Sequence, residues 1–307
     1  MRVSIEREFS LFKENEPLSR LHARDFMSFL IDNNNGIFTE IEESTAINTL
    51  EVKIAFINED EIDSKIIALF KFINEMARRK GINILWTMQQ KQEIISYNKF
   101  FIGFVFPELL ESFYCINSLH LHFELALDIA FDVYNGLNKK ANEFIDNTNI
   151  NYRKRYAYYQ SLRARVMGPL MFPYKIYNLE DFDRHLNVCR AFLERVLIKR
   201  GKLDNARVIF PKYFKDGSVF IGPDKLYTLT RLRPDLKTHQ DQRENISVEF
   251  RPILGSSNVE NDIENIKKAI RYVNEIIESK KRNANKECNL SEITRKRRVR
   301  KVILNCK

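Results

Sequence analysis

The chain has 307 residues, of which 44% are hydrophobic and 30% charged, a composition typical of a folded protein with an ample core. It contains no apolar run of about 18 residues, so no transmembrane helix is expected, and a strand predicted at its start leaves no room for a signal peptide. The four cysteines lack CxxC spacing, so we expect reduced thiols in a cytoplasmic protein.

The positive charge is concentrated near the C-terminal end. Residues 279–307 carry 11 Lys/Arg and 2 Asp/Glu, whereas residues 1–278 carry 39 of each. The body is therefore neutral, and an acidic protein or a nucleic acid is expected to bind only the basic end. The sequence predicts one domain, residues 1–282, and a basic tail, residues 283–307. The alternative is that Val299, Val302 and Ile303 pack on the body as a last helix.

The first predicted element is a β-strand at Val3–Phe9, where β-branched and aromatic residues alternate with polar ones. The alternation places Glu6 and Glu8 on one face and Arg7 on the other, apolar face. Two carboxylates on one face repel each other unless a cation lies between them, and oxygen-rich sites suit Mg²⁺ or Mn²⁺. The alternative reading is a solvated edge strand.

Further elements follow in chain order. Strands are predicted at Asn48–Ile54, Ile82–Met88, Asn117–Leu125 and Ile246–Arg251, the last stopped by Pro252. Helices are predicted at Asp60–Lys80, Ala126–Phe144, Tyr152–Met167, Asn178–Arg200 and Glu260–Ser279. Residues 202–245 are expected to be loops with short strands. Strands interspersed with long amphipathic helices predict an α+β fold with a mostly antiparallel sheet, whose apolar face packs against the helices.

Four of the predicted strands share an unusual polar face. In a chain with 50 Lys/Arg, a solvated face should show mostly Lys, Thr, Ser and Gln. These faces instead carry Glu6, Glu8, Glu51, Lys53, His120, His122, Glu124, Glu249 and Arg251. Carboxylates and imidazoles that converge on one sheet face indicate a divalent-metal site, and Lys53 and Arg251 would face phosphate.

Five short motifs also occur in the order found in glutamate–cysteine ligases. They are Ile5-Glu6-Arg7-Glu8, Leu50-Glu51-Val52, Leu119-His120-Leu121-His122-Phe123, Ser161-Leu162-Arg163 and Val248-Glu249-Phe250-Arg251. The chain most resembles the type 2, carboxylate–amine ligase branch of the glutamine synthetase superfamily. The resemblance implies a curved antiparallel sheet that forms an open funnel, with ATP and several Mg²⁺ (or Mn²⁺) ions at its base.

The resemblance also implies roles for single residues. Glu6, Glu8, Glu51, His120 and Glu249 match the family's metal ligands. His122 matches a position close to the nucleotide phosphates. Arg163 and Arg251 match positions that steady the transferring phosphoryl group and the substrate carboxylate, although Arg163 could also be one more charge in a basic helix.

Two features depart from the family pattern. Glu124 adds an acid where relatives often have a small or uncharged residue. A further carboxylate precedes the second strand in some relatives, and the register of Glu42-Glu43-Ser44 is left open by the sequence.

The sequence thus predicts an ATP-dependent ligase that joins a carboxylate, with glutamate expected, to an amine through an acyl phosphate. Two alternatives stay open: a ligase that modifies a lysine of a protein or peptide, and a non-catalytic nucleic-acid-binding or scaffold protein. The amine, the oligomeric state and the pathway are left undetermined.

Overall fold

The computed structural model describes residues 2–44, 46–87, 101–110, 117–145, 150–171, 174–223, 226, 228–233 and 245–304. Within these ranges, the side chains of residues 145, 150–153, 155–159, 245 and 284–304 are not described. None of the described helices combines the length and the apolar composition that crossing a bilayer requires.

One antiparallel sheet organises the described part of the chain, in the order β3-β4-β1-β6-β10-β9. Its strands are β1 (Arg2–Lys13), β3 (Glu40–Glu43), β4 (Thr49–Asn58), β6 (Ser118–Ala126), β9 (Thr230–Arg233) and β10 (Asn245–Leu254). The short strands β2 (Glu16–Pro17) and β5 (Asn83–Leu85) pair with β1, and β7 (Phe214–Lys215) forms a separate hairpin with β8 (Ser218–Val219). The predicted α+β class with a mostly antiparallel sheet is confirmed.

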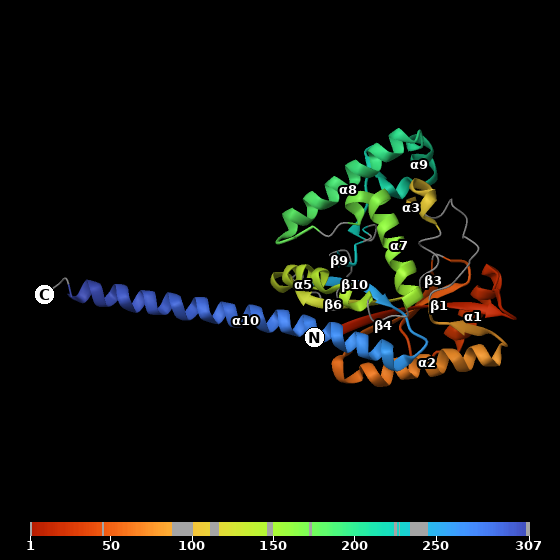
Figure 1. Cartoon of the computed structure of the whole chain (residues 1–307), viewed down its shortest axis with the longest axis horizontal. Coiled ribbons are helices and arrows are strands. Elements are labelled where there is room, and N and C mark those ends of the chain that lie inside the picture. The colour runs from red at the N-terminus through yellow and green to blue at the C-terminus, as the bar shows by residue number, and fades with distance from the viewer. Residues whose placement is uncertain are drawn as a thin grey trace.

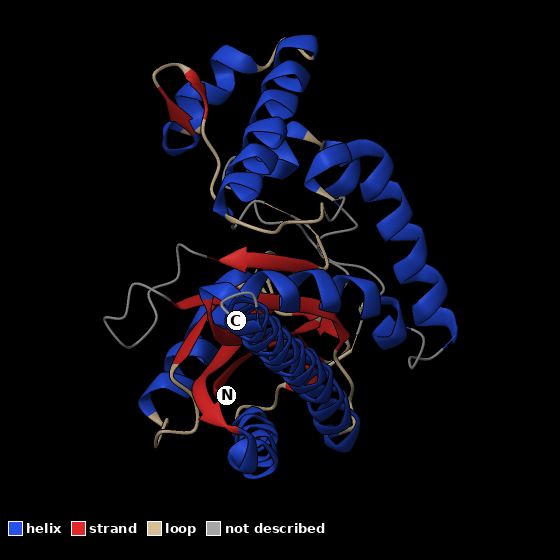
Figure 2. Cartoon of the chain, turned by 90° about the vertical axis from the view of Figure 1, so that its left-hand side faces the viewer, coloured by secondary structure: helices blue, strands red, loops and turns tan. Residues whose placement is uncertain are grey.

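Helices lie on both sides of this sheet. The helices are α1 (Arg20–Asp32), α2 (Ile62–Arg79), α3 (Phe101–Val105), α5 (Leu127–Lys140), α6 (Asn142–Ile145), α7 (Ile150–Met167), α8 (Leu179–Lys199), α9 (Leu203–Ile209) and α10 (Val259–Leu304). Helices α2 and α10 lie below the sheet, whereas α3, α7, α8 and α9 form a group above it (Figure 1). Figure 2 shows the sheet between these two groups from the side.

Helices cover the apolar face of the sheet, as the alternation predicted. Helices α2, α5 and α6 contact its strands, and α10 packs on α2 and α5. Ile5, Phe9, Val52, Leu121 and Phe250 on this face are all buried. Burial of such side chains contributes most of the favourable free energy of folding, at roughly 25 cal/mol for each Å² removed from water.

Arg7 is the exception on this apolar face, because its charged side chain is only 1% exposed. Its Nε donates to Oδ2 of Asp262 at 2.8 Å, and its Nη2 donates to the carbonyl of Trp86 at 2.8 Å. A Cβ at Gly255 would lie 2.0 Å from Nη1 of Arg7, so only glycine fits there. Since Asp262 lies in the first turn of α10, this buried ion pair joins the central strand to the start of that helix.

Three expectations are corrected. Pro252 lies inside β10, where the pairing with β6 shifts register between Phe250 and Ile253. A bulge tolerates a residue that has no N–H to donate. Residues 203–209, expected as loop, form α9, which has too few residues to show a helical period. In the third predicted strand only Asn83–Leu85 is in a strand, and Met88 lies outside the described residues.

The last helix is also longer than predicted. Helix α10 contains 46 residues and runs through the predicted boundary between residues 282 and 283 without a break. Its C-terminal half projects beyond the other elements (Figure 1). That residues 1–282 form one domain and residues 283–307 a separate tail stays a prediction.

Candidate active site

The predicted polar residues lie together on the face of the sheet opposite the helices α2 and α10. In the strand pairing, Glu6 on β1 lies opposite Lys53 on β4 and opposite His120 on β6. Glu8 lies opposite Glu51 in the same way. Because residues directly opposite each other on antiparallel strands project to the same face, neighbouring strands bring these side chains into contact.

Glu6 is the centre of this cluster. Its Oε1 lies 3.1 Å from Nζ of Lys53, and its Oε2 lies 3.0 Å from Nε2 of His122 and 3.5 Å from Nδ1 of His120. Burial opposes ionisation of Glu6, but the nearby His122 and His120 outweigh it, so the pKa of Glu6 lies well below its usual value. Glu6 is therefore a carboxylate at neutral pH.

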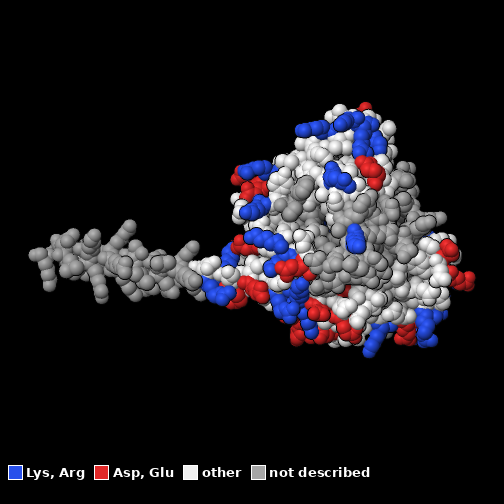
Figure 3. All heavy atoms as spheres, viewed as in Figure 1, with Lys and Arg blue, Asp and Glu red and all other residues white. Residues whose placement is uncertain are grey.

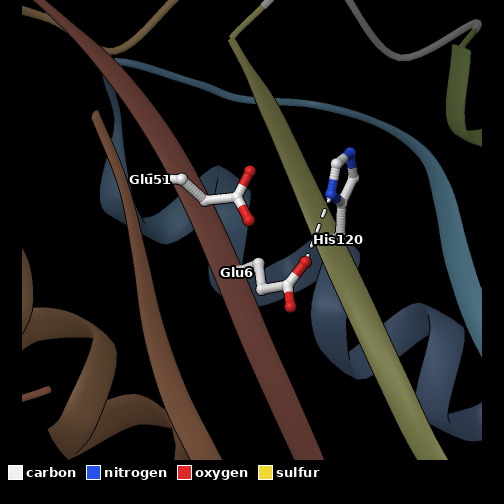
Figure 4. A group of neighbouring side chains, drawn as sticks. All are labelled: Glu6, Glu51 and His120. Atoms are coloured by element: carbon white, nitrogen blue, oxygen red, sulfur yellow. Dashed lines mark ion pairs between the residues drawn. The ribbon is translucent and has the colours of Figure 1, made fainter. Parts of the chain in front are cut away.

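Among the residues that the structure describes, two groups of side chains have the geometry to hold a metal ion. The ligand atoms of Glu6, Glu51 and His120 lie within 4.8 Å of one another, and those of Glu6, His122 and Glu249 do so as well. Figure 4 shows the side chains of the first group, which reach from β1, β4 and β6 toward a common point. Glu6 belongs to both groups, so two cations bound there would share one carboxylate.

The chemistry of these groups fits a divalent cation. Burial and repulsion from Glu6, Glu8 and Glu42 raise the pKa of Glu51 well above its usual value, and a cation would remove that repulsion. Burial and the charge of Arg251 lower the pKa of His120, which keeps the imidazole in the neutral, metal-binding form. Nε2 of His122 is buried and, although 3.0 Å from Glu6, forms no hydrogen bond.

Glu8 lies beside these groups, but its carboxylate accepts hydrogen bonds from two serines. Oγ of Ser44 donates to Oε1 at 2.7 Å, whereas the backbone N–H and Oγ of Ser118 both contact Oε2, at 2.8 and 2.5 Å. These bonds fix the orientation of the Glu8 side chain. Its role as a metal ligand stays a prediction.

The structure fixes the register that the sequence left open. Glu42 on β3 lies opposite Glu51 on β4, and so faces the cluster. Burial and the charges of Glu40 and Glu6 raise the pKa of Glu42. Its neighbour Glu43 binds Arg20 and Arg24 instead, at 2.9 and 2.8 Å. The alternation in Glu40–Glu43 was the signal for this additional acid.

A second cluster surrounds Glu249, which is 1% exposed. Nη1 of Arg231 and Nη1 of Arg233 lie 3.4 and 3.2 Å from Oε2 of Glu249, and Arg251 forms an ion pair with Oε1. Burial opposes ionisation, but Arg231 and Arg251 outweigh it, so the pKa of Glu249 lies well below its usual value. Three guanidinium groups around one carboxylate leave an excess of positive charge that favours an anionic ligand.

Sequence reasoning missed Arg231 and Arg233, because they lie in the stretch expected to be mostly loop. The alternation Thr230-Arg231-Leu232-Arg233 was the available signal, and it forms β9 next to β10. Arg163 is partly buried in α7. Its assignment to phosphoryl transfer stays a prediction, as does a direct role for Lys53 in binding nucleotide.

Glu124 lies one row beyond His122 on β6. Its Oε2 accepts from Nη2 of Arg2 at 2.7 Å, and its side chain is 4% exposed. Its other oxygen is buried without a hydrogen bond. The acid that departs from the family pattern is therefore at the edge of the site.

Comparisons with known proteins are limited to solved structures, since no family model and no curated protein matches the sequence. The chain is similar to a structure titled "Apo GmaS without ligand" (TM-score 0.35, 14% identity, 50% of this chain and 41% of that one). It is also similar to a "novel glutamine synthase homolog" (TM-score 0.42, 12% identity, 91% of this chain and 55% of that one). A third similar structure is Plasmodium falciparum glutamine synthetase (TM-score 0.42, 11% identity, 91% of this chain and 52% of that one). The chain thus spans about half the length of these proteins. At these TM-scores the argument for function rests on the side chains described above.

Proposed function

We propose that the protein is an ATP-dependent ligase that joins a carboxylate, with glutamate as the expected acid, to an amine. The observation that carries this proposal is the adjacency of two clusters on one sheet face. One cluster contains carboxylates and imidazoles suited to divalent cations, and the other contains three arginines around Glu249. Enzymes that transfer phosphoryl groups need both kinds of positive charge, because several negative charges must be brought together.

In this proposal the two clusters have separate tasks. Glu6, Glu51 and His120, with His122 and Glu249, would hold Mg²⁺ or Mn²⁺, which neutralises charge on phosphate oxygens when bound. The arginines bind anionic groups through fixed N–H donors. Glu249 is a positioning residue for Arg231, Arg233 and Arg251, because its buried carboxylate contacts all three.

The proposed reaction has two steps. An oxygen of the substrate carboxylate attacks the terminal phosphorus of ATP, the bond from phosphorus to ADP breaks, and an acyl phosphate forms. The amine then attacks the carbonyl carbon, phosphate leaves, and the amine loses a proton. Activation is needed because a free carboxylate is inert to amines, whereas an acyl phosphate has a good leaving group.

The experiment that tests the proposal is a product analysis with trapping. The protein is incubated with ATP, Mg²⁺ and glutamate, and hydroxylamine replaces the natural amine because it is small and strongly nucleophilic. A hydroxamate and ADP are expected in equal amounts. AMP and pyrophosphate would instead show adenylation and rule out the mechanism. No nucleotide turnover with a broad panel of acids would favour a non-catalytic role on the same fold.

A second possibility concerns the acceptor. Most of the basic end lies in the C-terminal half of α10, which projects beyond the other elements (Figure 1), and this favours a macromolecular, acidic partner. In that case the amine is a lysine of a protein or peptide. Mass spectrometry of acidic peptides that contain one lysine, incubated with ATP and labelled glutamate, distinguishes this acceptor from a small amine.

A further inference from the structure

A pocket lies away from the polar face of the sheet. It has a volume of about 600 Å³, in the range that holds a small organic ligand, and it lies between α5, the segment Tyr174–Tyr177 and α10. Its lining shares no residue with the clusters around Glu6 and Glu249. The described surface around it carries interspersed positive and negative side chains (Figure 3).

The wall of this pocket is preformed. Nδ2 of Asn135 donates to the carbonyl of Ile176 at 2.7 Å, and the N–H of Ile176 donates back to Oδ1 at 3.2 Å. These two bonds attach the segment to α5. At the floor, a Cβ on Gly136 would lie 2.4 Å from Ile276, so glycine allows α5 and α10 to approach closely there. The pocket therefore needs no ordering of its backbone to bind a ligand.

The charges in the pocket favour an anion. Lys280 is neutralised by Asp132, with Nζ to Oδ2 at 2.7 Å. Lys139 and Lys175 also line the pocket, are exposed, and form no ion pair with any residue in the described part of the chain. Two lysines without a counter-ion at one concave surface attract an anion such as a phosphate group.

The other side chains favour a planar ring system. Tyr174 and Tyr177 line the pocket, with 47% and 65% of their surface exposed. The ring of Tyr174 also packs on the ring of His185, with 4.5 Å between the ring centroids. Exposed aromatic faces are suited to stacking on a base. The side chain of Asn138, which lies beside the buried Tyr134, also lines the pocket.

We propose that this pocket binds a nucleoside phosphate, with the base against the tyrosines and the phosphates at Lys139 and Lys175. The pocket has room for a single nucleotide, so the free mononucleotide is the expected form and not a strand of nucleic acid. This proposal does not depend on the ligase reaction, because none of its residues takes part in that chemistry.

The test locates the ligand and does not rely on activity. The full-length protein in EDTA is titrated with ADP, and brief acetylation of lysines is followed by mass spectrometry. ADP is expected to slow the acetylation of Lys139 and Lys175 several-fold while leaving the exposed Lys71 and Lys199 unaffected. Because protection is measured at each lysine, ADP bound at the sheet face cannot produce this result.

A variant then tests the contact itself. In Lys139→Gln, the ADP concentration that half-protects Lys175 should rise about tenfold, whereas the matched variant Lys199→Gln should leave it unchanged. A titration with a short oligoadenylate distinguishes the source of the nucleotide. The proposal is overturned by a lack of protection, by equal protection of all four lysines, by an unchanged midpoint in Lys139→Gln, or by protection with the oligoadenylate alone.

Discussion

Glu249 lies directly opposite His122 in the pairing of β10 with β6, and this pair joins the two clusters of the site. His122 contacts Glu6, the centre of the acidic cluster, while Glu249 contacts Arg231, Arg233 and Arg251. One carboxylate therefore belongs both to a group suited to a cation and to a group suited to an anion. Positive and negative side chains therefore lie within one side chain's length of each other at this point of the sheet.

The first prediction concerns divalent cations. Mn²⁺ or Mg²⁺ should raise the melting temperature of the wild type, because a ligand at 100 times its Kd stabilises the folded state by about 2.7 kcal/mol. Glu6→Gln should abolish most of this increase, since Glu6 belongs to both metal-binding groups. Glu43→Gln is the control, because Glu43 binds Arg20 and Arg24 instead. An equal increase in all three proteins would show that the cations bind elsewhere.

The second prediction concerns Arg251. Arg251→Ala should lower the rate of hydroxamate formation by more than it weakens ATP binding, because the guanidinium is expected to act mainly on charge that develops in the transition state. Arg251→Lys should rescue only part of the rate, since a point charge cannot hold two oxygens at once. Rate measurements at saturating ATP, together with separate binding titrations, make the comparison. An equal loss in rate and in binding would assign Arg251 to ground-state binding alone.

The third prediction concerns pH. His185 is buried, and burial lowers its pKa from 6.5 to about 4. Between pH 6.5 and pH 4, His185 therefore binds a proton in the unfolded chain but not in the folded protein. The free energy of unfolding should therefore fall as pH drops from 6.5 toward 4, by an amount on the order of 2–3 kcal/mol. Urea denaturation of His185→Leu should lack this component, whereas the exposed His22→Leu should keep it.

The fourth prediction concerns the buried ion pair below the sheet. Asp262→Asn leaves Arg7 as an uncompensated buried charge and should lower the free energy of unfolding by about 3–5 kcal/mol. Asp63→Asn removes the exposed ion pair with Lys267 and should cost about 1 kcal/mol or less. Urea denaturation measures both. Similar losses in the two variants would mean that Arg7 finds another partner.

The fifth prediction concerns the basic end. The packing side chains that the structure describes on α10 lie before residue 278, and Lys280 contacts Asp132. Deleting residues 284–307 should therefore leave the melting temperature and the ligation of small substrates nearly unchanged. The same deletion should remove salt-sensitive binding to heparin or nucleic acid. A clear drop in melting temperature would instead support packing of Val299, Val302 and Ile303 on the body.

The polar face could be predicted from the sequence because its signal is local. A strand has a side-chain period of two, so the alternation around Glu6, His120 and Glu249 identifies a shared face within each strand. The apolar alternate residues then require that these faces all lie on the side away from the core. Pairing of strands that are distant in the chain then brings these side chains together on that face.

What the sequence could not provide depends on register and on long-range contacts. Glu42 joins the cluster only because β3 pairs with β4 in one register. Arg231 and Arg233 lie on a strand of four residues, too short to stand out from a loop. Arg7 was predicted on the apolar face, but its partner Asp262 is 255 residues away in the chain.

The close contact between Gly255 and Arg7 has a consequence for mutagenesis of this protein. A methyl group at position 255 would occupy the space of the Arg7 guanidinium, and Arg7 in turn forms its buried ion pair with Asp262. Single changes at any of the three positions should therefore appear intolerant in a saturation library, although none touches the sheet face. Combined changes that shorten the side chain at 7 and neutralise 262 should restore tolerance at 255. Substitutions at positions 7, 255 and 262 should therefore be tolerated only in combination.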